Sequence, residues 1–112
     1  MKSLRHPNIV EMIGTCTNPL ATVMEFCERG ALFAVLADKS MDLNWPMKKS
    51  MMLGLAQGIH YLHTRTPVII HRDLKSLNVL ITEDWITKVT DFGLSRYSPK
   101  SVSEQMTGTI NR

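Results

Sequence analysis

The chain has 112 residues, enough for one small domain, and 44% of them are hydrophobic, so a core can form. The net charge of +3 comes from scattered basic residues, which excludes a basic nucleic-acid-binding patch. Cys16 and Cys27 have no metal-ligand spacing and indicate reduced thiols in a cytoplasmic protein, while the most apolar stretch, Met51 to Ala56, is shorter than the ~18 residues of a membrane span.

The first part of the chain predicts two strands. A turn at His6-Pro7-Asn8 leads into an alternating pattern from Ile9 to Thr15. A second strand-like run, Leu20 to Met24, follows another proline turn and ends in the polar segment 25–30. These elements alone do not distinguish a functional segment from an ordinary hairpin followed by a surface turn.

Two helices are predicted next. The apolar spacing within Ala31 to Asp38 indicates a short helix, and a longer one begins after Asn44, a plausible N-cap, with Pro46 in its first turn. Apolar residues recur along it every three or four positions, so one face is apolar: Met47, Met51, Leu55, Ile59 and Leu62. Gly54 and Gly58 weaken this helix by about 1 kcal/mol each relative to alanine and could permit a close neighbour.

The remaining strands frame a polar loop. Short β-branched runs at Val68–Ile70 and Val79–Ile81 flank the loop 71–78, and a third strand is predicted from Trp85 to Thr90. The segment Leu94 to Arg112 is rich in serine and threonine and is predicted to be a loop. Its candidate phosphorylation sites, which could pair with Arg72, are Ser98, Ser101, Ser103 and Thr107, although such loops are often unmodified.

The loop carries groups that suit phosphoryl transfer. This reaction needs a carboxylate to orient a hydroxyl, a cation for the phosphoryl oxygens and oxygen ligands for a divalent metal. Asp73, Lys75 and Asn78 provide one of each, and Asp91 provides a second carboxylate, followed by Phe92 and Gly93. The alternative is that these residues cap turns, as loop Asp and Asn often do.

The segments His-Arg-Asp-Leu-Lys-Ser-Leu-Asn and Asp-Phe-Gly resemble, in order and spacing, two motifs of eukaryotic protein kinases. The resemblance implies an α+β, partial kinase-like fold. Residues 1–24 would end the small lobe, residues 25–30 would be the hinge, and residues 31–112 would run from the start of the large lobe through the activation loop. The phrase Asp73 to Asn78, with Gly108-Thr109 downstream, looks most like the tyrosine-kinase-like group of serine/threonine kinases.

The resemblance also implies roles. Asp73 would orient or deprotonate the hydroxyl of a serine or threonine in a protein substrate, and Lys75 would neutralise the γ-phosphate of ATP. Asn78 and Asp91 would hold the magnesium ions. Adenine would contact the backbone of the hinge, with Leu80 beneath it. Thr109 would lie near Asp73. The residues that would contact the nucleotide are Met24, Glu25, Cys27, Lys75, Leu80 and Asp91.

The histidines allow two interpretations. His60, His63 and His71, with Cys27, could be imagined as metal ligands, but they lack the tight spacing of such sites. His71 instead resembles the family's spine histidine, stacked under Phe92 with Met12 in the same column.

The sequence also departs from the family pattern. It contains no Gly-x-Gly-x-x-Gly loop and no Val-Ala-x-Lys strand, and no Ala-Pro-Glu follows Gly108-Thr109. We therefore expect little kinase activity from these 112 residues alone, and exposed apolar surface on the long helix and at Ile69-Ile70. The alternatives are a truncated or inactive kinase that acts as a regulatory or binding module, and a small-molecule phosphotransferase of kinase-like fold.

Overall fold

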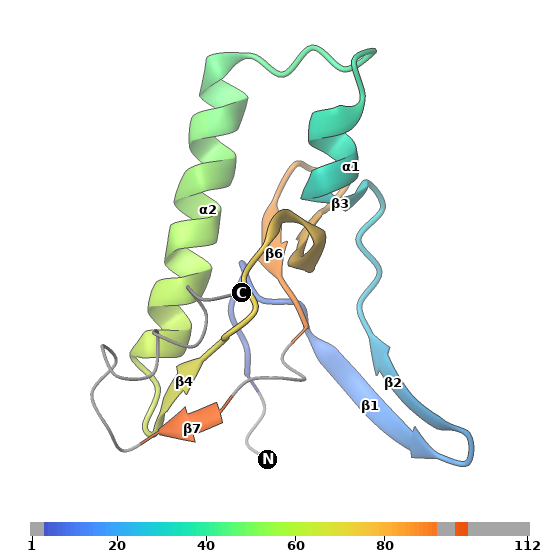
Figure 1. Cartoon of the computed structure of the whole chain (residues 1–112), viewed down its shortest axis with the longest axis vertical. Coiled ribbons are helices and arrows are strands. Elements are labelled where there is room, and N and C mark those ends of the chain that lie inside the picture. The colour runs from blue at the N-terminus through green and yellow to red at the C-terminus, as the bar shows by residue number, and fades with distance from the viewer. Residues whose placement is uncertain (1–3, 92–95, 99–112) are drawn as a thin grey trace.

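The computed structural model describes residues 4–91 and 96–98. Three small antiparallel sheets, a short helix, a long helix and one 3₁₀ turn make up this part of the chain (Figure 1). β1 (Met12–Thr17) pairs with β2 (Leu20–Met24) in a hairpin. β3 (Gly30–Ala31), β5 (Val79–Ile81) and β6 (Thr87–Val89) form the second sheet, and β4 (Val68–Ile70) pairs with β7 (Arg96–Ser98) in the third.

The helices follow the expected bounds. α1 covers Leu32–Ala37 and α2 covers Trp45–His63. The Asn44 side chain accepts a hydrogen bond from the Met47 amide at 3.0 Å, and Pro46 lies in the first turn, where its missing N–H costs nothing. The predicted N-cap of the long helix is therefore confirmed.

α2 and the strands enclose two small cores. In one, α2 contributes Leu62, which packs with the buried residues Ile9, Ile69 and Val89. In the other, Met51 of α2 meets Val35 of α1 and Ile81 of β5. Ile69 and Ile70 are 3% and 2% exposed, so the expectation that this strand would be uncovered is wrong.

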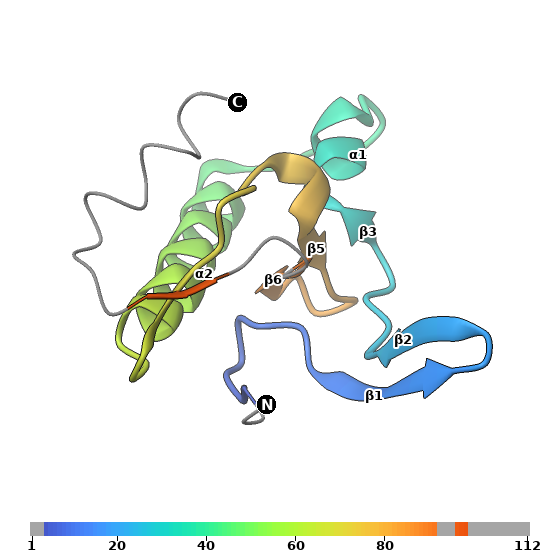
Figure 2. The same ribbon diagram turned by 60° about the horizontal axis from the view of Figure 1, so that its bottom comes forward.

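The first hairpin begins later than predicted. β1 starts at Met12, whereas Ile9 forms an isolated parallel bridge with Val89 and is buried. The alternating pattern predicted one strand from Ile9. In the structure Ile9 and Val10 are buried in the core, and only the residues from Met12 pair with β2. The hairpin itself is exposed and projects from the rest of the chain (Figures 1 and 2).

Two further expectations are corrected. The strand predicted from Trp85 to Thr90 is shorter, because Trp85 lies in the β5–β6 turn with its amide bonded to the Thr82 carbonyl at 3.0 Å. Part of the predicted loop after Leu94 is a strand, since Arg96–Ser98 pairs with β4. The first bound is set by a tight turn that the strand-like run concealed, and the second by pairing with a strand distant in sequence, which a local pattern cannot show.

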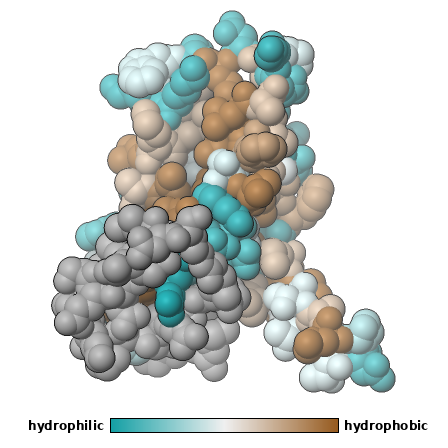
Figure 3. Space-filling model, viewed as in Figure 1, coloured by the Kyte–Doolittle hydropathy of each residue, from teal (hydrophilic) through white to brown (hydrophobic). Residues whose placement is uncertain are grey.

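The predicted apolar face of the long helix is covered, because Met51 and Leu62 are buried and Leu55 and Ile59 pack against the core, so the expectation that this face would be exposed is wrong. Other large apolar side chains of the helices remain exposed. Figure 3 shows hydrophobic residues gathered over α1 and α2 on one face. The exposed residues of these helices include Phe33, Leu36, Trp45, Met52 and Leu53. Among the residues that the structure describes, none of the helices has the length and apolar character that a membrane crossing requires.

The two glycines of α2 allow Asn8 to approach the helix. A Cβ at Gly58 would lie 2.7 Å from the Asn8 carbonyl oxygen, and one at Gly54 would lie 2.8 Å from Asn8 Nδ2. Two hydrogen bonds to β6 hold Asn8 in this position: its Nδ2 donates to the Thr87 carbonyl at 2.9 Å, and its carbonyl accepts from the Val89 amide at 2.9 Å. The glycines thus fix the N-terminal segment between α2 and β6.

Gly58→Ala is expected to lower the free energy of unfolding by up to about 2 kcal/mol. Alanine gains about 1 kcal/mol in helix propensity, but the clash is with backbone, and overpacking of this kind costs about 1–3 kcal/mol or more. Urea denaturation measures the difference. The control is Gly14→Ala, where nothing lies within 4 Å of the added Cβ; an equal or stabilising effect at Gly58 would contradict the packing argument.

Candidate active site

The loop 71–78 is held at both ends by buried strands. Ile69 and Ile70 of β4 precede it, and Val79 and Ile81 of β5 follow it. The loop ends in a single 3₁₀ turn, Ser76–Asn78, closed by the Asn78 amide donating to the Lys75 carbonyl at 2.8 Å. Because both ends are fixed in the core, the backbone that carries the polar side chains between them has a defined course.

Three predicted catalytic side chains meet within this loop. Asn78 Nδ2 donates to the Asp73 carbonyl oxygen at 2.8 Å and lies 3.5 Å from Asp73 Oδ2. Lys75 Nζ lies 3.6 Å from the same carboxylate oxygen, Asp73 Oδ2. Asn78 is buried and Lys75 is exposed, so the cluster runs from the core to the surface. The structure thus brings together a carboxylate, a cation and a carboxamide.

His71 connects the loop to the strand that leads to Asp91. Its Nδ1 accepts a hydrogen bond from the Asp73 amide at 3.2 Å, so the proton of the neutral ring is on Nε2. Nε2 lies 2.6 Å from the Thr90 carbonyl, to which it donates. The buried imidazole therefore fixes the backbone on both sides. The predicted stacking of His71 under Phe92 involves a residue outside the described part of the chain. Met12, the third residue of the predicted stack, is 43% exposed.

Asp91 follows a residue that is bonded to this loop. The Thr90 amide donates to the Asn78 carbonyl at 3.0 Å, so the backbone enters Asp91 directly from the end of the loop. Asp91 has φ +66° and Arg72 has φ +71°, a left-handed conformation that is uncommon for residues other than glycine. Such residues persist where the surrounding structure holds them, and they concentrate at functional sites.

The oxygen donors fit a magnesium ion. The Asp91 carboxylate is exposed, and the Asn78 side-chain oxygen makes no hydrogen bond within the described residues. Mg²⁺ prefers oxygen ligands and takes one or two protein groups together with phosphate oxygens and water. The described residues contain no group of three or more His, Cys, Asp or Glu side chains suited to hold a metal by themselves. The donor set therefore suits a metal that arrives with a phosphate ligand.

The predicted nucleotide contacts lie along the linking segment, Glu25–Gly30, and the sheet beside it. Met24, at the end of β2, has its sulfur 3.6 Å from Thr90 Oγ1. The Cys27 amide and the Glu25 carbonyl form no hydrogen bond within the described part of the chain, so they can face a ligand. Leu80 is half-buried opposite Ala31 in the sheet. Burial, followed by the Glu25 carboxylate, raises the pKa of the Cys27 thiol, which stays protonated at neutral pH.

Sequence reasoning missed Lys88. Its Nζ lies 2.9 and 3.0 Å from the two carboxylate oxygens of Glu25, and this pair is more buried than the other ion pairs of the described residues. Glu25 Oε1 also accepts from the Glu11 amide at 2.8 Å. The pair joins the linking segment to β6, the strand that leads to Asp91. A lysine between Thr87 and Val89 in a short buried strand was the available signal.

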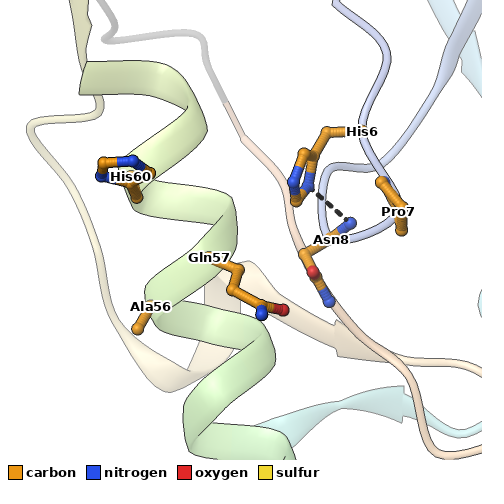
Figure 4. A pocket seen from close by; sticks show the side chains of 6 residues that line it. All are labelled: His6, Pro7, Asn8, Ala56, Gln57 and His60. Carbon is orange, nitrogen blue, oxygen red and sulfur yellow. Dashed lines mark hydrogen bonds between the residues drawn. The ribbon is translucent and has the colours of Figure 1, made fainter. Parts of the chain in front are cut away.

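Two pockets lie elsewhere, along α2. One, of about 490 Å³, is formed where His6, Pro7 and Asn8 face Gln57 and His60 (Figure 4). The other extends from the start of α2 to the β5–β6 turn. Neither is lined by a predicted site residue, so the chemistry of the loop, and not cavity size, identifies the candidate site.

Several predicted residues lie outside the described part of the chain. These are Phe92, Gly93, Ser101, Ser103, Thr107 and Thr109. Ser98 lies in β7, where only the backbone is described.

The comparisons with known proteins agree with this geometry. The profile of the family described as protein tyrosine and serine/threonine kinase matches residues 1–111. The probable serine/threonine-protein kinase drkC of Dictyostelium discoideum is 47% identical over 107 residues, which are 94% of this chain and 14% of that protein. The probable serine/threonine-protein kinase SIS8 of Arabidopsis thaliana is 47% identical over 98 residues, 86% of this chain and 10% of that protein.

The chain belongs to the protein tyrosine and serine/threonine kinase family, and it corresponds to part of a kinase catalytic domain. The expected α+β, partial kinase fold is confirmed, with antiparallel strands followed by the helical part. The chain spans only 14 to 17% of the length of the Dictyostelium relatives drkC and drkA.

Proposed function

We propose that these residues are the nucleotide- and metal-binding part of an ATP-dependent serine/threonine protein kinase. The observation that supports it best is that Asn78 and Lys75 both approach Asp73, in a loop whose Asn78 carbonyl is bonded to the Thr90 amide, one residue before Asp91. The relatives' names support a serine/threonine kinase, as does Lys75 two residues after Asp73. Residues 1–24 then end the small lobe, residues 25–30 form the hinge and residues 31–112 begin the large lobe.

Each side chain has a separate task in the proposed reaction. Asp73 orients the hydroxyl of the substrate serine or threonine and takes up its proton, while Lys75 steadies the negative oxygens of the γ-phosphate. Asn78 and Asp91 would hold Mg²⁺, which supplies charge neutralisation between the phosphates. Exposure of Lys75 fits this role, because its ammonium can turn from Asp73 to an incoming phosphate.

The purine has its own proposed contacts. The Glu25 carbonyl and the Cys27 amide would read the adenine edge through fixed backbone geometry, beside Met24 and above Leu80. The Lys88–Glu25 ion pair ties the start of this segment to β6. The free thiols of Cys16 and Cys27 accord with a cytoplasmic location.

A regulatory role is the second candidate. Exposed apolar residues on both helices could engage a protein partner without any catalysis. Nucleotide binding that depends on Asp91 would favour the enzyme, and its absence would favour the binding module.

Titration of the chain with ATP, followed by amide signals in NMR spectra, tests the proposal. We expect shifts at Cys27 and Leu80 with ATP alone, and at Asn78 and Asp91 when Mg²⁺ is added. Asp91→Asn is expected to lose the magnesium effect by about tenfold or more, because an uncharged ligand replaces the carboxylate. Asp42→Asn, which neutralises an exposed carboxylate before α2, is the control. Equal behaviour of the two variants would refute the assigned metal site.

A further inference from the structure

The C-terminal half of the linking segment is fastened to the β5–β6 turn. The Arg29 guanidinium donates to the Glu83 carbonyl through Nε at 3.1 Å and Nη2 at 3.0 Å, and its carbon lies 4.0 Å from the centroid of the Trp85 ring. In the other direction, the Glu83 amide donates to Glu28 Oε2 at 2.8 Å. Two adjacent side chains thus engage both backbone groups of one turn residue. We call this set, Glu28, Arg29, Glu83 and Trp85, the clasp.

The turn that receives Arg29 is itself held firmly. Trp85 has φ +64°, which is rare for a bulky residue, and it packs against the core cluster of Val35, Met51 and Ile81. Thr82 closes the turn twice, since its carbonyl accepts from Trp85 and its hydroxyl accepts from the Ile86 amide at 3.1 Å. A conformation of this kind persists only where its surroundings stabilise it. The indole is therefore a fixed platform for the guanidinium.

The clasp acts on the backbone proposed to bind adenine. The Arg29 amide donates to the Ile81 carbonyl at 3.0 Å, and the Gly30 amide donates back to the Cys27 carbonyl at 3.1 Å. Gly30 has φ +73°, a conformation that glycine adopts without strain. A shift of Arg29 would therefore move Cys27 through one short turn. Hydrogen bonds from its own amide and from the Glu83 amide hold the pKa of Glu28 below its usual value, so this partner stays ionised.

We propose that Arg29 is a positioning residue: held between the Glu83 carbonyl and the Trp85 ring, it fixes the backbone at Cys27 for a purine nucleotide. This inference rests on the proposed function for its ligand and adds a residue that touches neither nucleotide nor metal. Residues 28–30 are then held to the β5–β6 turn, and Cys27 is held through its carbonyl, which accepts from the Gly30 amide.

Arg29→Met tests the clasp, and Arg65→Met is a matched control. Arg65 also stacks on an aromatic ring, with its guanidinium carbon 4.0 Å from the Tyr61 centroid, and its Nε donates to a backbone carbonyl at 3.1 Å. We expect Arg29→Met to accelerate amide hydrogen exchange at Arg29 and Gly30 about tenfold, as loss of a local constraint does, with no change in α2. Arg65→Met should leave residues 25–30 unchanged.

A spectroscopic readout adds a second measure. In a Trp45→Phe background Trp85 is the only tryptophan, and loss of its guanidinium cover in Arg29→Met should shift its emission to longer wavelength. Arg29→Lys, which keeps a cation without the forked donor, should restore most of the emission and part of the exchange protection. If Arg29→Met does not fold, Arg29→Lys provides the test in its place. Unchanged exchange and emission in Arg29→Met would overturn the clasp, as would fully unchanged exchange at Gly30 in Arg29→Lys should the methionine variant not fold.

The consequence for ligand binding is measured with ATP in the absence of Mg²⁺. If the parent chain binds ATP, Arg29→Met should weaken the affinity about fivefold to tenfold while the magnesium effect at Asp91 is retained. Equal affinity in the two chains would overturn the positioning role and leave the proposed function standing. If the parent chain binds no ATP, the proposed function fails, and with it the assigned ligand, while exchange and emission still decide whether the clasp fixes Cys27.

Discussion

The 112 residues alone are expected to transfer no measurable phosphate from ATP to a protein substrate. Phosphoryl transfer depends almost entirely on positioning and charge stabilisation, and positioning can account for about 7–11 kcal/mol of a barrier. The sequence contains no glycine-rich loop to cover the phosphates and no Val-Ala-x-Lys strand. The catalytic loop can hold one side of the reaction without these parts, but it cannot align the γ-phosphate.

Incorporation of labelled phosphate measures this directly. The comparison is a chimera in which the upstream and downstream kinase segments of a full-length relative are joined to these residues. The chimera should be active and should lose activity about 10³-fold or more on Asp73→Asn, in line with loss of a group that acts in the transition state. Activity of the 112 residues that disappears with Asp73→Asn would show that the missing parts are dispensable.

Asn78→Ala is expected to affect both stability and metal binding. The Asn78 side chain is buried, and its loss removes the hydrogen bond that Nδ2 donates to the Asp73 carbonyl at 2.8 Å. A hydrogen bond of this kind contributes about 0.5–1.5 kcal/mol, so the free energy of unfolding should fall by that amount. Because the carboxamide is also a proposed magnesium ligand, the magnesium effect on ATP binding should fall at least tenfold, about as much as ligand-shell changes cost elsewhere.

The control for this variant is Leu77→Ala in the same 3₁₀ turn, where the side chain is 53% exposed. Surface changes of this kind usually stay within about 0.5 kcal/mol. Denaturation in urea and ATP titration with and without Mg²⁺ give the two readouts. If Asn78→Ala has the same free energy of unfolding and the same magnesium response as Leu77→Ala, the carboxamide neither supports Asp73 nor binds metal.

Local pattern predicted those elements whose signals are local. Asn44 and Pro46 marked the start of α2 because capping chemistry acts within one turn, and β2, β4 and β5 were found because they are short runs between turn residues. The bounds that failed depend on distant partners. Ile9 pairs with Val89 instead of extending β1, and Trp85 leaves its strand to contact Arg29.

The candidate site was predictable in a similar way. The residue types and spacing of Asp73, Lys75 and Asn78 indicated their chemistry, and the structure shows them in contact. The contacts that set the linking segment were not predictable. Arg29 bonds to a backbone carbonyl, which carries no residue-specific signal, and Lys88 meets Glu25 across 63 positions. Such contacts follow from the fold and cannot be derived from the motif.

The left-handed backbone at Arg72, Trp85 and Asp91 has an evolutionary consequence. At each position glycine would relieve conformational strain of roughly 1 kcal/mol. At Trp85 the loss of an indole that packs against Val35, Met51 and Ile81 outweighs this gain. At Arg72 and Asp91 nothing comparable within the described part of the chain opposes the change, so a descendant freed from phosphoryl transfer should tolerate glycine at these two positions and not at Trp85.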